Sequence, residues 1–172
     1  MKTPICNFCA KTGALCPEDS KKLKSGQISQ LDVDSSVKLT KLAERDKVID
    51  RLTLVKALKS NGEVILLLGS GNLKILRTSP QSIESINRAF GTKVWLFEAD
   101  ITDRKLLEEV FYPVRVLTVN MIWLPDGSKL TKVILPSFRG VEEKIDEKVI
   151  KRVLKTLRGL DVMIEYERRT TA

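Results

Sequence analysis

The sequence predicts an α+β protein with two small sheets, each carrying helices on one face, behind a cysteine-containing N-terminal segment. Three observations lead to this prediction. Short runs of alternating or continuous apolar residues predict strands, and stretches with helical spacing separate them. The predicted order, β-β-α-α-β-α followed by β-β-α-β, amounts to a weak internal repeat. All three cysteines lie within the first 30 residues.

The N-terminal segment, residues 1–30, cannot bury a core of its own. It holds three Cys, two Gly, two Pro and a lysine cluster, but few large apolar residues. Such a segment needs a metal ion, or a neighbour to pack on. We therefore expect a separate arm at residues 1–30, a first unit at residues 31–112 and a second, partial unit at residues 113–172.

The first unit is expected to contain a helix, a hairpin, two helices, a strand and a last helix. In that order the elements cover residues 31–51, 52–59 with 63–69, 73–77, 80–90, 93–98 and 103–111. The hairpin turn is Ser60-Asn61-Gly62, because Asn and Gly tolerate a positive φ. The expected helix caps are Asp34 or Ser35, then Ser79 before Pro80, and Thr102.

The second unit is expected to repeat part of this order. Strands at 114–124 and 129–135 are joined by the turn Pro125-Asp126-Gly127-Ser128. A polar link follows at 137–144. Asp146 then caps a helix that runs to Arg158 and ends at Gly159, and the last strand covers residues 161–167.

Composition narrows the possible functions. Thirty Lys and Arg against 22 Asp and Glu give a net charge of +8. A basic surface favours anionic partners, and nucleic acid is the expected one, although a solvated Lys- and Glu-rich surface is the alternative. The absence of His removes the commonest general base. No set of convergent carboxylates stands out either, since Asp100, Asp103, Glu108 and Glu109 surround a predicted helix start, so we expect no enzyme.

The sequence also predicts the compartment. The longest uncharged apolar run, Val64 to Leu68, is too short to span a bilayer, and the N-terminus has no apolar core of a secretory signal. We therefore expect a cytoplasmic protein, in which cysteines are free thiols or metal ligands rather than disulfides.

The cysteines are spaced like a metal-binding knuckle. Cys6 and Cys9 form a Cys-x-x-Cys pair, and Cys16 is followed three residues later by Asp19. These four side chains can hold a structural Zn²⁺ with one oxygen ligand. The alternative is a degenerate knuckle that holds no metal.

Basic residues gather at two places that can contact RNA. In a β-β-α-α-β block, a Gly-x-x-Gly loop between the helices presents backbone N–H groups to phosphates. Here that loop reads Arg77-Thr78-Ser79-Pro80, which is also compatible with an ordinary helix–helix turn. The candidate RNA-binding residues are Lys74, Arg77, Thr78, Ser79, Arg88 and Lys93, followed by Lys148, Lys151, Arg152 and Lys155 on the last helix. A solvated helix face is the alternative for this second group.

Few aromatic side chains are available to stack on bases. The candidates are Trp95, Phe97, Trp123 and Phe138. The first three lie in predicted strands, where aromatic residues are more often part of the core.

Three stretches of the chain resemble the archaeal NusA-like proteins that carry type II KH domains. The Cys-x-x-Cys knuckle of that family is similar to the opening CNFCAKTGALCPED. Its first KH domain is similar to EVILLLGSGNLKILRTSPQSIESINRAFGTKVWLFE, and the start of its second KH-like unit to YPVRVLTVNMIWLPDG. The chain departs from the family at Asp19, which replaces the fourth Cys, and in lacking both Gly-x-x-Gly loops.

The resemblance implies two tandem KH-like units and RNA binding linked to transcription elongation or termination. It also implies a divergent member of the family, with RNA polymerase or the ribosome as partner. The alternative is a ribosome- or polymerase-associated structural protein with degenerate KH domains.

Overall fold

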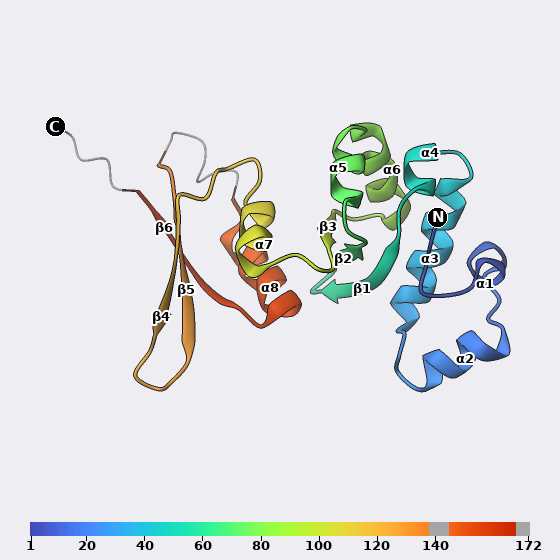
Figure 1. Cartoon of the computed structure of the whole chain (residues 1–172), viewed down its shortest axis with the longest axis horizontal. Helices are drawn as coiled ribbons and strands as arrows, with labels where there is room; N and C mark the ends of the chain where they lie inside the picture. The colour runs from blue at the N-terminus through green and yellow to red at the C-terminus, as the bar shows by residue number, and fades with distance from the viewer. Residues whose placement is uncertain (138–144, 168–172) are drawn as a thin grey trace. The chain divides into compact units, whose positions relative to one another are not determined.

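The computed structural model describes residues 1–137 and 145–167. Contacts divide the chain into two units, Met1–Asp100 and Ile101–Ala172. Each unit contains one three-stranded sheet with its helices (Figure 1). The predicted α+β class, with two small sheets and an N-terminal cysteine cluster, is therefore confirmed. The domain limits expected at residues 30 and 112 stay predictions. Apart from Ser137, the expected link at 137–144 lies outside the described residues, as does Phe138.

The sheet of the first unit is mixed. Its strands are β1 (Leu54–Ser60), β2 (Glu63–Leu68) and β3 (Val94–Glu98), in the order β1-β2-β3. β1 and β2 are antiparallel, and β3 runs parallel to β2. The predicted turn joins β1 to β2, with Asn61 at φ 47° and Gly62 at φ 97°. This backbone conformation is one that Asn and Gly adopt most readily.

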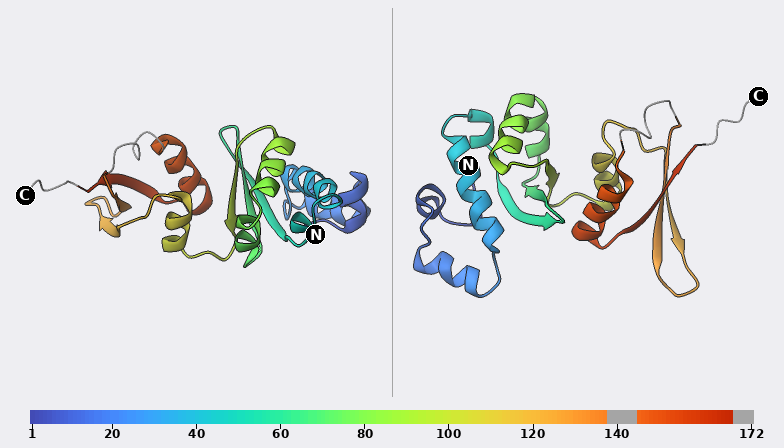
Figure 2. Two further views of the ribbon diagram at one scale, coloured as in Figure 1. Left: turned by 90° about the horizontal axis from the view of Figure 1, so that it is seen from above. Right: turned by 180° about the vertical axis from the view of Figure 1, so that it is seen from behind.

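Four helices accompany this sheet. α3 (Gln30–Ala43) and α4 (Lys47–Asp50) precede β1, and α5 (Asn72–Arg77) and α6 (Pro80–Phe90) connect β2 to β3. α3 contacts both β1 and α6, so these helices lie together beside the sheet (Figure 2). Apolar side chains from the helices and strands form one core, which includes Leu39, Ile49, Leu54, Leu66, Leu76 and Ile86. Burying each such side chain stabilises the fold by about 2 kcal/mol.

The single helix expected at 31–51 is in fact two helices. Asp46 interrupts it, because its carboxylate accepts hydrogen bonds from the N–H groups of Val48 and Ile49 and so begins α4. The expected caps, Asp34 and Ser35, are also wrong, since both residues lie inside α3.

The residue that caps α3 is Ser29. Its hydroxyl accepts the N–H of Asp32 at 3.1 Å, and the Asp32 carboxylate accepts the N–H of Ser29 at 2.7 Å, which completes a capping box. The other Asp32 oxygen accepts the N–H of Ala57 in β1 at 2.5 Å. Asp32 is almost fully buried, and it therefore joins the start of α3 to the middle of the first strand.

The N-terminal arm packs on α3 through a small core of its own. Two short helices, α1 (Asn7–Thr12) and α2 (Pro17–Lys24), fold over it. The core contains the buried residues Ile5, Cys9, Ala10, Ile28 and Val33, the last of which belongs to α3. The start of the chain is also attached to the strand region, because Lys2 exchanges backbone hydrogen bonds with Leu52 and Leu54.

The sheet of the second unit repeats the pairing of the first. Its strands are β4 (Thr118–Trp123), β5 (Lys129–Leu135) and β6 (Asp161–Tyr166), in the order β4-β5-β6. β4 and β5 are antiparallel, and β6 runs parallel to β5. The expected strand at 114–124 begins only at Thr118. The chain is still turning before it, since the N–H of Val114 bonds to the carbonyl of Phe111.

Two helices accompany this sheet, α7 (Asp103–Val110) and α8 (Glu147–Arg158). Asp146 caps α8 as predicted, accepting the N–H of Val149, and Gly159 ends it. Thr102 stands at the start of α7, but its side chain makes no capping hydrogen bond. No helix among the described residues is long and apolar enough to cross a membrane.

Ser79 likewise stands at the start of α6 without a side-chain capping bond. Its hydroxyl lies 2.9 Å from that of Ser82, which donates to the Asp46 carboxylate at 2.6 Å. The Ser79 hydroxyl therefore belongs to a polar cluster that links α6 to the start of α4. Ser79 occupies the predicted cap position, but its side chain does not make the expected capping hydrogen bond.

Replacing Asp32 with Ala should destabilise the first unit. The change leaves the buried N–H of Ala57 without its acceptor and removes half of the capping box. We expect the free energy of unfolding to fall by about 3 kcal/mol, measured by chemical denaturation.

Ser35→Ala is the matched control within the same helix. Ser35 is fully buried and its hydroxyl has no hydrogen-bond partner among the described residues, so its removal should leave the stability unchanged or raise it by about 1 kcal/mol. Equal losses in the two variants would contradict the linking role of Asp32.

Candidate metal centre and basic surfaces

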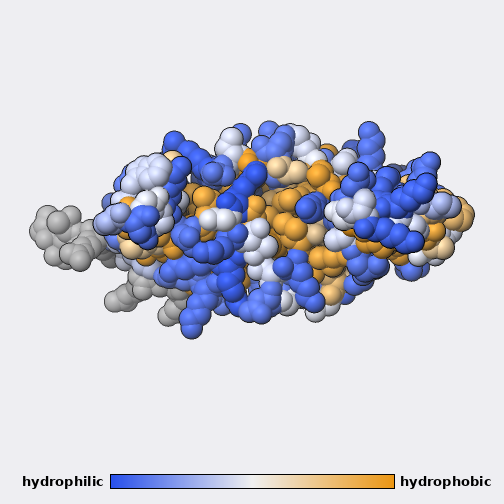
Figure 3. Space-filling model, turned by 90° about the horizontal axis from the view of Figure 1, so that it is seen from below, coloured by the Kyte–Doolittle hydropathy of each residue, from blue (hydrophilic) through white to orange (hydrophobic). Residues whose placement is uncertain are grey.

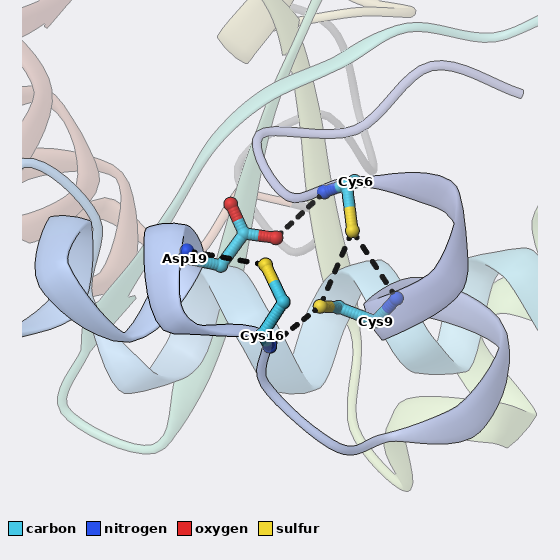
Figure 4. A group of neighbouring side chains, drawn as sticks. All are labelled: Cys6, Cys9, Cys16 and Asp19. Atoms are coloured by element: carbon cyan, nitrogen blue, oxygen red, sulfur yellow. Dashed lines mark hydrogen bonds between the residues drawn. The ribbon is translucent and has the colours of Figure 1, made fainter.

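The four predicted metal ligands come from two equivalent local structures (Figure 4). Cys6 caps α1 and its sulfur accepts the N–H of Cys9 at 3.5 Å. Cys16 caps α2 and its sulfur accepts the N–H of Asp19 at 3.4 Å. Each half therefore places one ligand at the cap and a second one three residues later. Asp19 takes the position that Cys9 has in the first half.

The four side chains converge on one point. One ligand atom from each of Cys6, Cys9, Cys16 and Asp19 lies within 4.8 Å of all the others. The Cys6 and Cys9 sulfurs are 3.3 Å apart, and the Cys9 sulfur also accepts the N–H of Cys16 at 3.1 Å. Cys9 and Asp19 are buried, whereas Cys6 is exposed. Three sulfurs and one oxygen at these separations suit a tetrahedral metal ion, so the cluster can hold one.

The protonation of the ligands follows from their surroundings. Burial raises the pKa of the Cys9 thiol to about 12. The N–H of Asp19 lowers the pKa of Cys16. Burial opposes ionisation of Asp19, but hydrogen bonds from Lys22 Nζ and the Cys6 N–H, each 2.8 Å long, hold its pKa well below the usual range. Asp19 is therefore an anion at neutral pH, whereas Cys9 must lose a proton to bind a metal.

All four positions of a tetrahedral site are filled by protein side chains. A closed set of this kind leaves no vertex for a substrate or an activated water, and it is typical of structural sites. Lys22 completes the centre by holding Asp19 in place. Lys22 was not among the predicted site residues, although its spacing of three residues from Asp19 on a helix indicates an ion pair.

The turn between α5 and α6 uses its own hydrogen-bond donors internally. The N–H of Thr78 bonds to the carbonyl of Ile75, and that of Ser79 bonds to the carbonyl of Leu76. The hydroxyl of Thr78 also donates to the carbonyl of Ile75 at 2.7 Å. Pro80 has no N–H group. The turn therefore lacks the outward backbone donors of a Gly-x-x-Gly loop, and only side chains remain for contact with phosphates.

The predicted basic residues of the first unit have different surroundings. Lys74 is exposed and, like Arg77, belongs to the last turn of α5. Arg88 lies 3.6 Å from Glu84 in an exposed ion pair. Lys93 Nζ lies 4.3 Å from the centre of the Trp95 ring. Lys74 and Arg77 are therefore the two predicted basic residues that lie beside the α5–α6 turn.

The predicted residues of α8 are partly neutralised. Lys151 pairs with Glu147 at 3.2 Å and Lys155 pairs with Asp161 at 2.6 Å. Arg152 donates to the carbonyl of Lys148. Such exposed pairs contribute little to stability and can exchange for a phosphate. On the face seen in Figure 3, hydrophilic side chains predominate and hydrophobic ones show between them.

Within the described part of the chain, the acidic residues near the start of α7 do not gather around a common point where they could bind a metal ion. Asp103 lies 3.7 Å from Arg158, and Glu108 lies 3.5 Å from Arg104. The cysteine cluster is the one group of possible metal ligands found in the described part of the chain.

Comparison with known proteins gives the fold alone. No protein-family model matches the chain, and no curated protein matches its sequence. Among solved structures, 64 chains match. One of them, "Crystal structure of APE1850", has 15% sequence identity and a TM-score of 0.51, covering 74% of this chain and 95% of that chain. At this identity, the likeness concerns the arrangement of helices and strands.

Cys9→Ser should abolish tight metal binding and loosen the arm. The change removes a buried ligand that also belongs to the small core on α3. We expect the parent to bind one Co²⁺, used as a spectroscopic probe, with the absorption of a tetrahedral thiolate site, and the variant to lose that spectrum.

Hydrogen exchange should then accelerate in residues 1–28 of the variant while the β1–β3 sheet stays protected. Thr12→Ala is the control, because the Thr12 hydroxyl lies at the exposed end of α1, where it donates to the carbonyl of Phe8 and accepts the N–H of Ala14, and it is not a metal ligand. A parent protein that binds well under one metal ion per chain would contradict the site.

Proposed function

We propose that this protein is a non-enzymatic RNA-binding protein of the archaeal NusA-like kind, linked to transcription elongation or termination. The observation that carries the proposal is the repeated unit, in which a hairpin is followed by helical structure and a strand parallel to the second hairpin strand. That order resembles a type II KH domain, an RNA-binding module. The net charge of +8 supports an anionic partner.

RNA is held through side chains rather than through a backbone clamp. The N–H groups of Thr78 and Ser79 are satisfied inside the turn, so Lys74 and Arg77 supply the contact there. Arg88 and Lys93 extend it, and the basic residues of α8 add a second contact. Phosphate contacts of this kind give affinity that depends steeply on salt and discriminates weakly between sequences.

The metal centre holds a structural Zn²⁺ in this proposal. Zinc accepts mixed sulfur and oxygen ligands in tetrahedral geometry, and three neighbouring thiolates favour it over magnesium or calcium. Its role is to fix the arm against α3. The protein acts in the cytoplasm, with RNA polymerase or the ribosome as the larger assembly.

A second candidate is a structural protein of a ribosome or polymerase assembly with degenerate KH-like units. The observation that favours it is the closed α5–α6 turn, which has lost its backbone donors. Pull-down from the native host before and after ribonuclease treatment separates the two. Protein partners that survive digestion favour the structural role, and partners lost with the RNA favour RNA binding.

The double substitution Lys74→Ala with Arg77→Ala should weaken binding to unrelated single-stranded RNAs by similar factors. Both side chains would otherwise neutralise phosphates beside the α5–α6 turn. The slope of log affinity against log salt should become shallower by roughly one to two units, measured by fluorescence anisotropy over a salt series.

The control exchanges one lysine in the last turn of α3 and one arginine just after that helix, Lys41→Ala with Arg45→Ala, which carries the same charge change at exposed positions. If the test variant keeps the affinity and slope of the parent, the turn is only a connection between helices. Equal losses of affinity in the test and control variants would mean that RNA responds only to the net charge of the protein and not to a contact at the turn.

A further inference from the structure

Large hydrophobic side chains are exposed mainly in one segment of the second unit. Five of the seven exposed ones among the described residues lie between positions 112 and 124, namely Tyr112, Leu117, Met121, Trp123 and Leu124. Met121 is 70% exposed and Trp123 is 64% exposed. Apolar residues gathered in this way usually mark a binding surface.

Strand pairing places two of these residues, Met121 and Trp123, on one face of the sheet. Met121 lies opposite Thr131, and Trp123 lies opposite Lys129, so all four point to the same side of the sheet. Thr131 and, two residues on, Val133 are buried, which identifies this side as the one that carries the core. β4 is an edge strand, so the exposed side chains of Met121 and Trp123 form the uncovered edge of the core face.

A hollow of about 440 Å³ lies along this margin. Its walls come from α7, from β4 with the residue before it, from β5 and from the residue before β6, and include Asp103, Leu107, Leu117, Met121, Thr131 and Leu160. We call the hollow together with Trp123 and Lys129 the β4 shelf. The hollow has the size of a small-ligand pocket, and the Trp123 ring continues its apolar surface along the strand.

The charges around the shelf favour an anionic, flat ligand. Lys129 Nζ lies over the Trp123 ring, 4.5 Å from its centre. Arg104 and Asp103 both line the hollow, but each is paired with an opposite charge, Arg104 with Glu108 at 3.5 Å and Asp103 with Arg158 at 3.7 Å, so Lys129 supplies the positive charge of the shelf. The nearest acid in the hairpin, Asp126, uses its carboxylate inside the turn, where it accepts the N–H and hydroxyl of Ser128. An exposed aromatic ring with an ammonium group over one of its faces suits a nucleobase and its phosphate.

We propose that the β4 shelf binds single-stranded RNA, with one base stacked on Trp123, an adjacent base in the hollow beside Met121, and a phosphate near Lys129. The inference rests on the proposed RNA-binding function and adds to it a contact with bases. A protein partner fits less well, because fixed charges are depleted at the centre of protein interfaces. The shelf differs from the α5–α6 turn and from α8 in that its affinity comes from stacking.

The test compares Trp123→Ala and Trp123→Phe with the parent on a short single-stranded RNA of mixed sequence. Loss of the ring should weaken binding about tenfold, while Phe should keep most of the affinity, because stacking needs only an aromatic face. The salt slope should stay unchanged in both variants, since no ion pair is lost. Trp123 is exposed, and thermal unfolding of each variant verifies that the fold is kept.

Phe8→Ala is the matched control, an aromatic residue with the same 64% exposure in the N-terminal arm. An affinity loss for Trp123→Ala well beyond that for Phe8→Ala supports the shelf. If Trp123→Ala binds RNA like the parent, the shelf inference is overturned while the proposed function stands. If Trp123→Ala instead loses a protein partner that survives ribonuclease, the shelf is a protein-docking surface and the inference is again overturned. A parent that binds no RNA overturns both.

Discussion

One buried carboxylate, that of Asp32, fixes the first unit. It accepts hydrogen bonds from the start of α3 and from the backbone of β1, so the helix and the sheet cannot shift against each other without leaving polar groups unsatisfied. The apolar core between α3, the strands and α6 then packs in a single arrangement. A hydrophobic contact alone would tolerate small displacements, whereas these directional hydrogen bonds do not.

The arm depends on the same helix. Val33, one residue after Asp32, belongs to the small core that also buries Cys9, and so the position of α3 decides where one metal ligand lies. Lys2 adds a backbone connection beside β1. The metal centre therefore belongs structurally to the first unit. A bound ion would stabilise the packing of α1 and α2 on α3, and not a domain that folds by itself.

Local patterns in the sequence were sufficient for much of this architecture. The Asn61-Gly62 turn, the Asp146 cap and the spacing of the four ligands each depend on neighbours in the chain, and the structure has all three. Ser29 was not predicted as the cap, although Ser29 and Asp32 have the spacing of a capping box. Only the bond from Asp32 to a strand 25 residues later lies beyond local sequence patterns. Trp123 was expected in the core because it lies in a strand. Its exposure follows from the edge position of β4 in the sheet, which composition does not reveal.

The mixed sheets also determine the order in which the strands can pair while the chain is being synthesised. In each unit the hairpin strands are neighbours in sequence, but the parallel strand pairs with residues about 30 positions earlier: Val64 with Val94 (94 − 64 = 30) and Val133 with Ile164 (164 − 133 = 31). The hairpin can close as soon as it leaves the ribosome, whereas the middle strand keeps one open edge until its partner is made. Each nascent unit therefore passes through a stage in which β2 or β5 presents unpaired backbone groups, and the helical segment made in between is the first structure available to shield them.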